Sequence, residues 1–236
     1  MIHSILPRVK RVLFCAASFG LASGWLASTA SAANLLADPG FELQTLAPNP
    51  NPTGVAGWAN FGGASFLNTP LAHTGNWVLD TPDNGGGYSV PGTYETFAAT
   101  PGEQFTFSGF VYTPNALVTN SNDFAILQMA FFPGGAPNNY AGGTQIGNAV
   151  GVNVGTPAGG GGIALPQGVW TPASVTATAP AGTNSMAAYL LDINADTNGD
   201  FYFDDTSLTA TNVPEPTTLG LLGVTGLVAL RRRRRA

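Results

Sequence analysis

Residues 100–112 read TPGEQFTFSGFVY, and their pattern of apolar residues is the clearest indication of the fold class. After a Pro-Gly turn, the apolar side chains of Phe105, Phe107 and Val111 alternate with residues that point the other way. A period of two residues places each set on one face of a β-strand, so that one face can pack against a core. The stretch therefore predicts a long strand with one buried face.

The same period recurs along the chain, and no segment between residues 33 and 212 has the apolar period of an amphipathic helix. Short runs bounded by Gly, Pro and Asn predict further strands over 124–131, 170–178, 186–193 and 201–208. Residues 124–131 are apolar at most positions, which predicts a strand buried on both faces. The glycine-rich residues 132–168 predict a long excursion with one short strand pair near 144–154. We expect about nine or ten strands in an all-β, two-sheet antiparallel jelly-roll sandwich.

Basic residues are confined to the two ends of the chain. Of the 236 residues, 8 are Lys or Arg and 13 are Asp or Glu. Between Ala33 and Val213 there are 12 acidic residues and no Lys or Arg, a formal charge of −12. Such a region cannot neutralise a phosphate backbone and lacks the Lys of a P-loop, so we expect neither nucleic-acid nor nucleotide binding. The carboxylates, amides, hydroxyls and aromatic rings that remain suit calcium and sugars.

Residues 1–32 predict a secretory signal peptide that signal peptidase removes. A positively charged start is followed by an apolar run over 12–26 and by the A-x-A pattern of Ala30 and Ala32. The alternative is a retained membrane anchor, which the cleavage pattern disfavours. Cys15, the only cysteine, lies inside the apolar run, so we expect a mature chain without disulfides.

Residues 213–236 carry three elements in a fixed order. These are Val213, Pro214, Glu215 and Pro216, then an apolar segment over 217–230, then Arg231, Arg232, Arg233, Arg234 and Arg235. As a transmembrane helix the apolar segment would be about 21 Å long, shorter than the roughly 30 Å hydrocarbon core. The arginines would hold its end on the cytoplasmic side. The layout predicts transient membrane insertion by a short helix.

This order of elements resembles the PEP-CTERM sorting signal of exported bacterial proteins. The resemblance implies export through the inner membrane and processing by an exosortase near the Pro-Glu-Pro. It implies residence in the cell envelope, at the cell surface or in the extracellular matrix of a Gram-negative-type bacterium, in an exopolysaccharide or biofilm setting. A plain membrane tail would not explain the position of the Pro-Glu-Pro.

Several segments of the predicted domain, residues 33–212, resemble the strands of carbohydrate-binding-module-like, galactose-binding-like jelly rolls. In chain order they are Asn34–Glu42 with Gly57-Trp58, Thr100–Val111, Gly168–Thr171 with Ala179–Thr183, and Phe201–Leu208. The resemblance implies a fold more firmly than a function, because one fold hosts many functions.

The resemblance also implies a structural calcium ion that joins Glu42 to Asp204 or Asp205. Adjacent strand residues face opposite sides, so only one of the two aspartates is expected to point toward Glu42. The alternative is a solvated carboxylate at a sheet edge.

A weaker calcium candidate is the loop that contains Asn194, Asp196 and Asn198. Oxygen-bearing side chains at alternate positions followed by Gly are typical of calcium loops. Both flanks read as strands, however, so a tight hairpin turn at Asn198-Gly199 is the favoured interpretation.

Aromatic side chains could stack on sugar rings, although most aromatic residues of a sandwich lie in its core. The candidates for ligand binding are Trp77, Tyr88, Tyr94, Tyr112 and Tyr140. Trp58 and Trp170 occupy positions that are usually structural in the resembling domains, and we set them aside.

Catalysis has little support in the sequence. No pattern selects a carboxylate pair for glycoside hydrolysis, and His73 lacks a nucleophile motif and is expected to be a surface loop residue. We therefore expect an exported, non-enzymatic surface protein that associates with polysaccharide. The alternatives are a purely structural or adhesive protein without a sugar ligand and, less favoured, a glycoside hydrolase.

Overall fold

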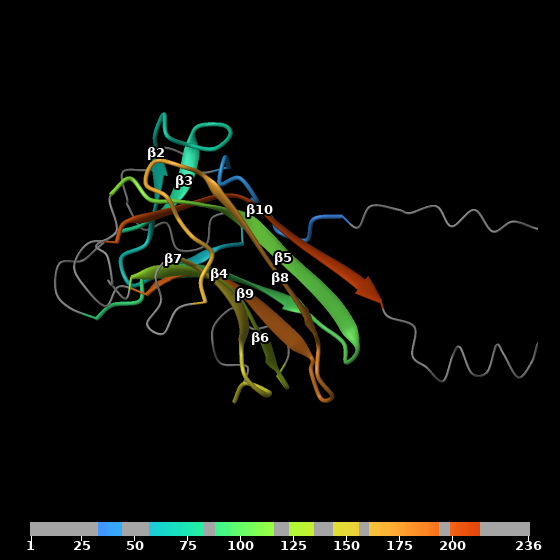
Figure 1. Ribbon diagram of the computed structural model, residues 1–236. Helices are drawn as coiled ribbons and strands as arrows, with labels where there is room; N and C mark the ends of the chain where they lie inside the picture. The colour runs from blue at the N-terminus through green and yellow to red at the C-terminus, as the bar shows by residue number, and fades with distance from the viewer. Residues whose placement is uncertain are drawn as a thin grey trace, which may run out of the picture. The chain divides into compact units, whose positions relative to one another are not determined.

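The computed structural model describes residues 33–43, 57–82, 88–115, 123–134, 144–155, 161–193 and 199–212, which contain ten strands (Figure 1). The strands are β1 (Ala59–Phe61), β2 (Ser65–Asn68), β3 (Trp77–Thr81), β4 (Gly92–Ala98), β5 (Glu103–Tyr112), β6 (Phe124–Phe132), β7 (Val150–Gly155), β8 (Thr171–Thr178), β9 (Ser185–Ile193) and β10 (Phe201–Asn212). Within these ranges no residue is helical, and no helix is long and apolar enough to span a membrane.

Several predicted features lie outside the described residues. They are the signal peptide with Ala30 and Ala32, the loop residues Asn194, Asp196 and Asn198, Tyr140, the motif Val213–Pro216, the apolar segment 217–230 and Arg231–Arg235.

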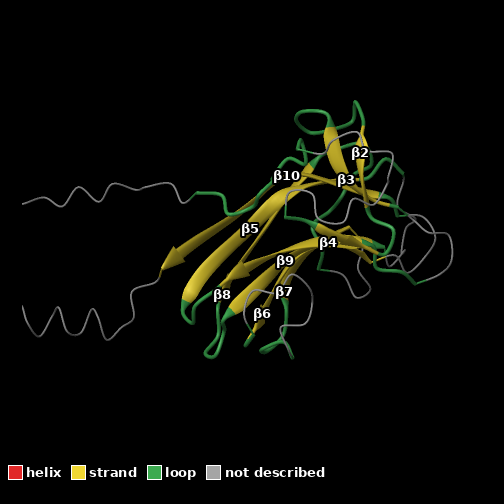
Figure 2. Ribbon diagram, turned by 180° about the vertical axis from the view of Figure 1, so that it is seen from behind, coloured by secondary structure: helices red, strands yellow, loops and turns green. Residues whose placement is uncertain are grey.

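The strands form two five-stranded sheets that lie face to face (Figures 1 and 2). The first sheet has the order β1-β4-β9-β6-β7 and the second has the order β2-β3-β10-β5-β8. All named strand pairings are antiparallel. The chain passes repeatedly between the sheets from β3 onward, which gives the double Greek-key order of a jelly roll. The prediction of a two-sheet antiparallel jelly-roll sandwich is confirmed.

The core lies between the sheets and follows the alternation that the sequence shows. In β5, Phe105, Phe107 and Val111 are fully buried, whereas Tyr112 on the opposite face is half-buried. The first sheet faces them with residues that include Leu127. Each large apolar side chain that is buried in this way stabilises the fold by about 1.5–3 kcal/mol.

Strand β6 is buried on both faces only in its second half. Leu127 and Met129 face the core, and Ala130 and Phe132 pack against Tyr189 on the outer side of the first sheet. The first half is half-buried on that outer side, so the prediction of burial on both faces holds for part of the strand.

In the described part of the excursion after β6, residues 133–134, 144–155 and 161–168, there is one strand, β7, where a strand pair was predicted. β7 pairs with β6, and a single parallel bridge joins its Val154 to Ile163. The backbone groups of β7 form their hydrogen bonds with the edge of β6, so β7 needs no partner strand from within the excursion.

The hairpin predicted between the strands on either side of Asn198-Gly199 is wrong. β9 pairs with β4 and β6 in the first sheet, whereas β10 pairs with β3 and β5 in the second. β9 and β10 therefore lie in different sheets and form no hairpin with each other. Local turn chemistry cannot reveal whether the next strand stays in the same sheet.

Candidate functional site

The outer face of the second sheet carries side chains in line across its strands. Asp80 of β3 lies opposite Tyr202 of β10, and Tyr202 lies opposite Tyr112 of β5. Trp170 precedes β8 by one residue and extends the line beyond Tyr112, because Val111 pairs with Thr171. We call Trp170, Tyr112 and Tyr202 the aromatic row; Asp80 stands at its acidic end.

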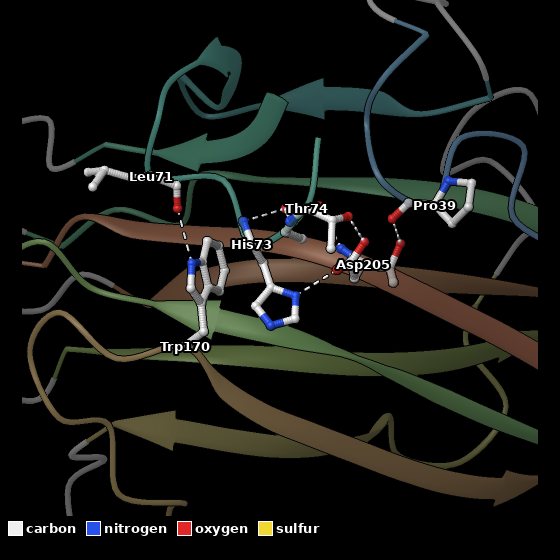
Figure 3. A network of polar contacts seen from close by, with 8 residues as sticks. Pro39, Leu71, His73, Thr74, Trp170 and Asp205 are labelled. Atoms are coloured by element: carbon white, nitrogen blue, oxygen red, sulfur yellow. Dashed lines mark hydrogen bonds and ion pairs between the residues drawn. The ribbon is translucent and has the colours of Figure 1, made fainter. Parts of the chain in front are cut away.

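The three rings of the aromatic row contact one another. The Tyr112 and Tyr202 ring centroids are 5.9 Å apart with the rings 14° from parallel, and the Tyr112 and Trp170 centroids are 5.1 Å apart. The Trp170 Nε1–H donates a hydrogen bond to the Leu71 carbonyl at 3.0 Å (Figure 3). All three rings are half-buried, so they lie at the surface of the sheet and outside the core. Such rings have an apolar face and a polar handle, which suits contact with a wet ligand.

The acidic end of the row holds two carboxylates. Burial is the main cause that raises the pKa of Asp80 to about 6, and the charge of Asp200 adds to it. Burial, together with the charges of Asp80 and Asp200, also raises the pKa of Tyr202. Asn115 Nδ2 donates to Asp200 Oδ2 at 3.0 Å, whereas no described residue donates a hydrogen bond to the Asp80 carboxylate.

Beside the aromatic row, two carboxylates of β10 fasten the loop between β2 and β3 (Figure 3). Asp204 Oδ2 accepts hydrogen bonds from the backbone N–H groups of His73 at 2.8 Å and Thr74 at 3.1 Å. Asp205 contacts His73 Nδ1 at 2.6 Å and accepts a hydrogen bond from Thr74 Oγ1 at 2.6 Å. Burial raises the pKa of Asp204 to about 6, although the N–H groups of Thr74 and Asp205 act to lower it.

We predicted that only one of the adjacent aspartates would point toward Glu42, but both reach the loop whose end Glu42 also contacts. The register of β10 against β5 shifts between Asp204 and Ser207, and Asp205 has a φ of 45°. A bulge of this kind breaks the strict alternation of strand faces. It also lets the N–H and hydroxyl of Thr206 both donate to the Pro39 carbonyl, each at 2.7 Å.

Glu42 approaches the same cluster from the N-terminal segment. Its Oε1 accepts hydrogen bonds from the N–H groups of Asn76 at 2.8 Å and Trp77 at 2.9 Å. A Cβ placed on Gly40 would lie 3.7 to 3.9 Å from Asp204, Asp205 and Glu42 side-chain atoms, so the three predicted calcium residues surround Gly40. Each of the three already accepts hydrogen bonds from the protein. In the described ranges, no group of three or more His, Cys, Asp and Glu residues has a metal-binding arrangement, and the calcium site stays a prediction.

His73 joins the carboxylate cluster to the aromatic row. Its ring stacks on Phe110 with centroids 3.9 Å apart, and it meets Trp170 edge-on at 5.5 Å. It lies in a loop, as predicted, but it is half-buried. Asp204 holds its backbone N–H, and Asp205 holds its ring. Its carboxylate partner Asp205 is 132 residues away in the sequence, so no local spacing could have revealed the contact.

The predicted sugar-binding aromatics do not gather at one place. Tyr112 belongs to the aromatic row, whereas Trp77 packs against the core. Tyr88 is 73% exposed, and Tyr94 packs on the outer face of the first sheet. Of the predicted candidates, Tyr112 is therefore the one that the structure places in the row.

The two tryptophans that were set aside differ in environment. Trp58 is fully buried, and its Nε1–H donates to the Asp38 carbonyl at 3.0 Å, as expected of a structural residue. Trp170 is half-buried in the aromatic row. The alternation of β8 indicates that Trp170 faces outward, because it lies on the same side of the strand as the exposed Pro172 and Ser174.

Comparison with known proteins bears on the two parts of the chain separately. Residues 212–235 match the PEP-CTERM protein-sorting motif, so the chain carries this motif at its C-terminus. No curated protein matches the chain.

Solved structures match the sandwich at low sequence identity. An apo form cyclase from Fischerella sp. is 14% identical over 78% of this chain and 99% of that chain, with a TM-score of 0.52. TmCBM61 in complex with beta-1,4-galactotriose is 13% identical over 76% of this chain and 99% of that chain, with a TM-score of 0.45. The enzymatically active domain of bacteriophage CBA120 tailspike protein 4 is 11% identical over 75% of this chain but only 21% of that chain, with a TM-score of 0.48. The similarity to the cyclase supports the fold alone. The TM-scores of the other two structures are too low to support an argument.

Proposed function

We propose that this protein is an exported surface protein whose sandwich associates with polysaccharide through the outer face of the second sheet, without catalysing a reaction. The observation that carries the proposal is the aromatic row of Trp170, Tyr112 and Tyr202, which ends at Asp80. The C-terminal sorting motif, which implies export and a cell-envelope or surface location, supports the cellular part of the proposal.

The dimensions of the row suit an oligosaccharide. Four positions on neighbouring strands span about 14 Å, since strands lie about 4.8 Å apart. Half-buried rings provide apolar contact for sugar C–H groups, and the tyrosine hydroxyls and Asp80 provide hydrogen-bonding groups around them. A polymer with a repeated unit could contact several such domains at once, which raises the overall affinity.

The sorting signal supports a route to the surface. In this proposal, signal peptidase cuts after Ala32, the segment 217–230 enters the inner membrane, and an exosortase processes the chain near Val213–Pro216. The protein then resides at the surface or in the matrix of a Gram-negative-type cell, in an exopolysaccharide or biofilm setting. Deletion of Arg231–Arg235 should alter retention or processing in cell fractions, and unaltered processing would count against this route.

A structural calcium ion is a separate proposal. It is supported by the position of Glu42, Asp204 and Asp205 around Gly40 in a domain without Lys or Arg. Glu42 Oε2 accepts no hydrogen bond from a described residue, so this oxygen would contribute to the ion. Calcium would then supply positive charge that offsets repulsion among the three carboxylates.

The binding proposal is tested with the exported protein and a panel of soluble polysaccharides in affinity electrophoresis, including the exopolysaccharide of the host. We expect retardation by at least one polysaccharide, and its loss in Trp170→Ala. Tyr88→Ala is the matched control, because Tyr88 is exposed and lies outside the row. Without retardation by any polysaccharide, the structural or adhesive alternative would stand. Release of reducing ends would revive the glycoside hydrolase.

A further inference from the structure

Within the described ranges, no Lys or Arg lies at the acidic end of the aromatic row. Asp80 lies opposite Tyr202 on the neighbouring strand and interacts electrostatically with Tyr202 and with Asp200. The sequence offers no Lys or Arg between residues 33 and 213. The one histidine of this region, His73, contacts Asp205 at 2.6 Å.

Three groups at this end favour a cation. A half-buried carboxylate is costly unless it is paired, and a second carboxylate nearby increases the cost. The face of a tyrosine ring attracts an ammonium group within about 6 Å of its centroid. A positive group next to Asp80 and Tyr202 would therefore gain from both residues and from Asp200. A uronic-acid carboxylate would meet only repulsion there.

We propose that the aromatic row selects amino-sugar polysaccharides with free amino groups, and that one ammonium group binds between the Asp80 carboxylate and the Tyr202 ring. This inference rests on the proposed function, because it names the glycan class for that same surface. The remaining sugar units lie along Tyr112 and Trp170. A bare calcium ion fits this end less well, since calcium takes about six to eight oxygen ligands and Asp80 and Asp200 supply at most four.

The test compares three oligosaccharides by isothermal titration calorimetry with the exported protein at low salt and about pH 6.5, above the Asp80 pKa of about 6. The probes are chitosan oligosaccharide, the N-acetylated oligosaccharide of the same length and backbone, and an oligogalacturonate. We expect chitosan to bind about tenfold more tightly than its acetylated counterpart, and the uronate not to bind.

Variants separate a specific ammonium site from general attraction of a polycation to an acidic protein. Asp80→Asn should remove the preference for free amino groups and leave binding of the acetylated oligosaccharide within about twofold. Tyr202→Leu keeps an apolar side chain without the ring and should weaken the preference. Glu103→Gln is the matched control: it removes the same charge at the opposite end of β5 and should retain the preference.

The pH dependence gives a further readout. Protonation of Asp80 at about pH 5 should reduce the preference for chitosan, although acid makes chitosan itself more positive. Among the described residues, the titratable groups that interact with Asp80 are Asp200 and Tyr202, and the uncharged Ser65 of β2 lies opposite it on the other side.

The possible failures are distinct. Equal binding of chitosan and its acetylated counterpart would overturn this inference and leave the proposed function intact. Loss of the preference in Glu103→Gln to the same extent as in Asp80→Asn would also overturn it. If no oligosaccharide or polysaccharide binds at all, the proposed function itself fails.

Discussion

The outer faces of the two sheets each carry a tyrosine pair of similar ring spacing in very different surroundings. Tyr94 and Tyr189 on the first sheet have ring centroids 5.7 Å apart, and Tyr112 and Tyr202 on the second sheet have centroids 5.9 Å apart. The first pair belongs to an apolar cluster in which Tyr189 is 4% exposed. The second pair is half-buried and ends at a carboxylate. An aromatic pair is thus not a binding surface by itself; the groups around it decide its use.

The largest expected effect is the loss of protein stability when a buried ring of the first sheet is removed. Tyr189→Ala should lower the free energy of unfolding by about 3–4 kcal/mol, because it removes a buried ring and leaves a cavity. Tyr112→Ala should cost about 1–2 kcal/mol, since that ring is half-buried. Urea denaturation of both variants measures the difference. Equal losses of unfolding free energy in the two variants would show that the two faces do not differ in this way.

The second prediction reverses the order of the two faces in binding. Tyr112→Ala should weaken polysaccharide binding at least about tenfold, whereas Tyr94→Ala on the first sheet should change it less than twofold. Affinity electrophoresis with the same polysaccharide reads out both variants. A comparable loss of binding in Tyr94→Ala would mean either that the ligand binds the first sheet or that the variant is unfolded. The denaturation curves distinguish these two outcomes.

The two sheets each hold a carboxylate whose pKa is raised by burial, Glu95 on the first sheet and Asp80 on the second. Burial is the main cause that raises the pKa of Glu95 from 4.5 to about 7, although the Ala37 N–H donates to it and lowers the pKa. The folded state therefore holds this proton more tightly than the unfolded state between these two pH values. The stability that Glu95 contributes is fully present below pH 4.5 and is lost as pH rises through about 7.

Glu95→Gln should accordingly raise the free energy of unfolding at about pH 8, by about 1 kcal/mol, and flatten its fall between about pH 5 and pH 8. Thermal unfolding across this range measures it, with Glu103→Gln as the control for removal of one negative charge. A variant less stable than wild type at pH 8 would show that the ionised carboxylate is needed in its hydrogen bond with Ala37.

The smallest expected effect concerns calcium. EDTA should lower the melting temperature by a few degrees, because an ion that binds only the folded state stabilises it. Glu42→Gln keeps a hydrogen-bond acceptor for Asn76 and Trp77 and should remove most of the EDTA effect. An identical melting curve with EDTA and with added calcium would leave the three carboxylates as hydrogen-bond acceptors only.

The strands and the sorting signal were predictable because each depends on a local pattern. The alternation in residues 100–112 specifies which side chains of β5 face the core without reference to any other strand. The C-terminal motif is likewise read in sequence order, and residues 212–235 match it.

The candidate site was predicted only in part, because it depends on contacts between distant segments. Tyr112 was identified, but its neighbours Tyr202 and Trp170 are brought to it by strand order and register. The contacts of His73 with Asp204 and Asp205 join residues that are more than a hundred positions apart. The bulge at Asp205 needs a positive φ, which Asp tolerates but which its sequence context does not announce.

In the proposed function, the aromatic row on the second sheet is the polysaccharide-binding surface. The most direct measurement is the dissociation constant of the exported protein and its Trp170→Ala variant for the same polysaccharide, with both proteins shown to be folded by circular dichroism. We expect the variant to lose affinity by at least about tenfold while its fold is unchanged. Undiminished affinity in the folded variant would contradict it.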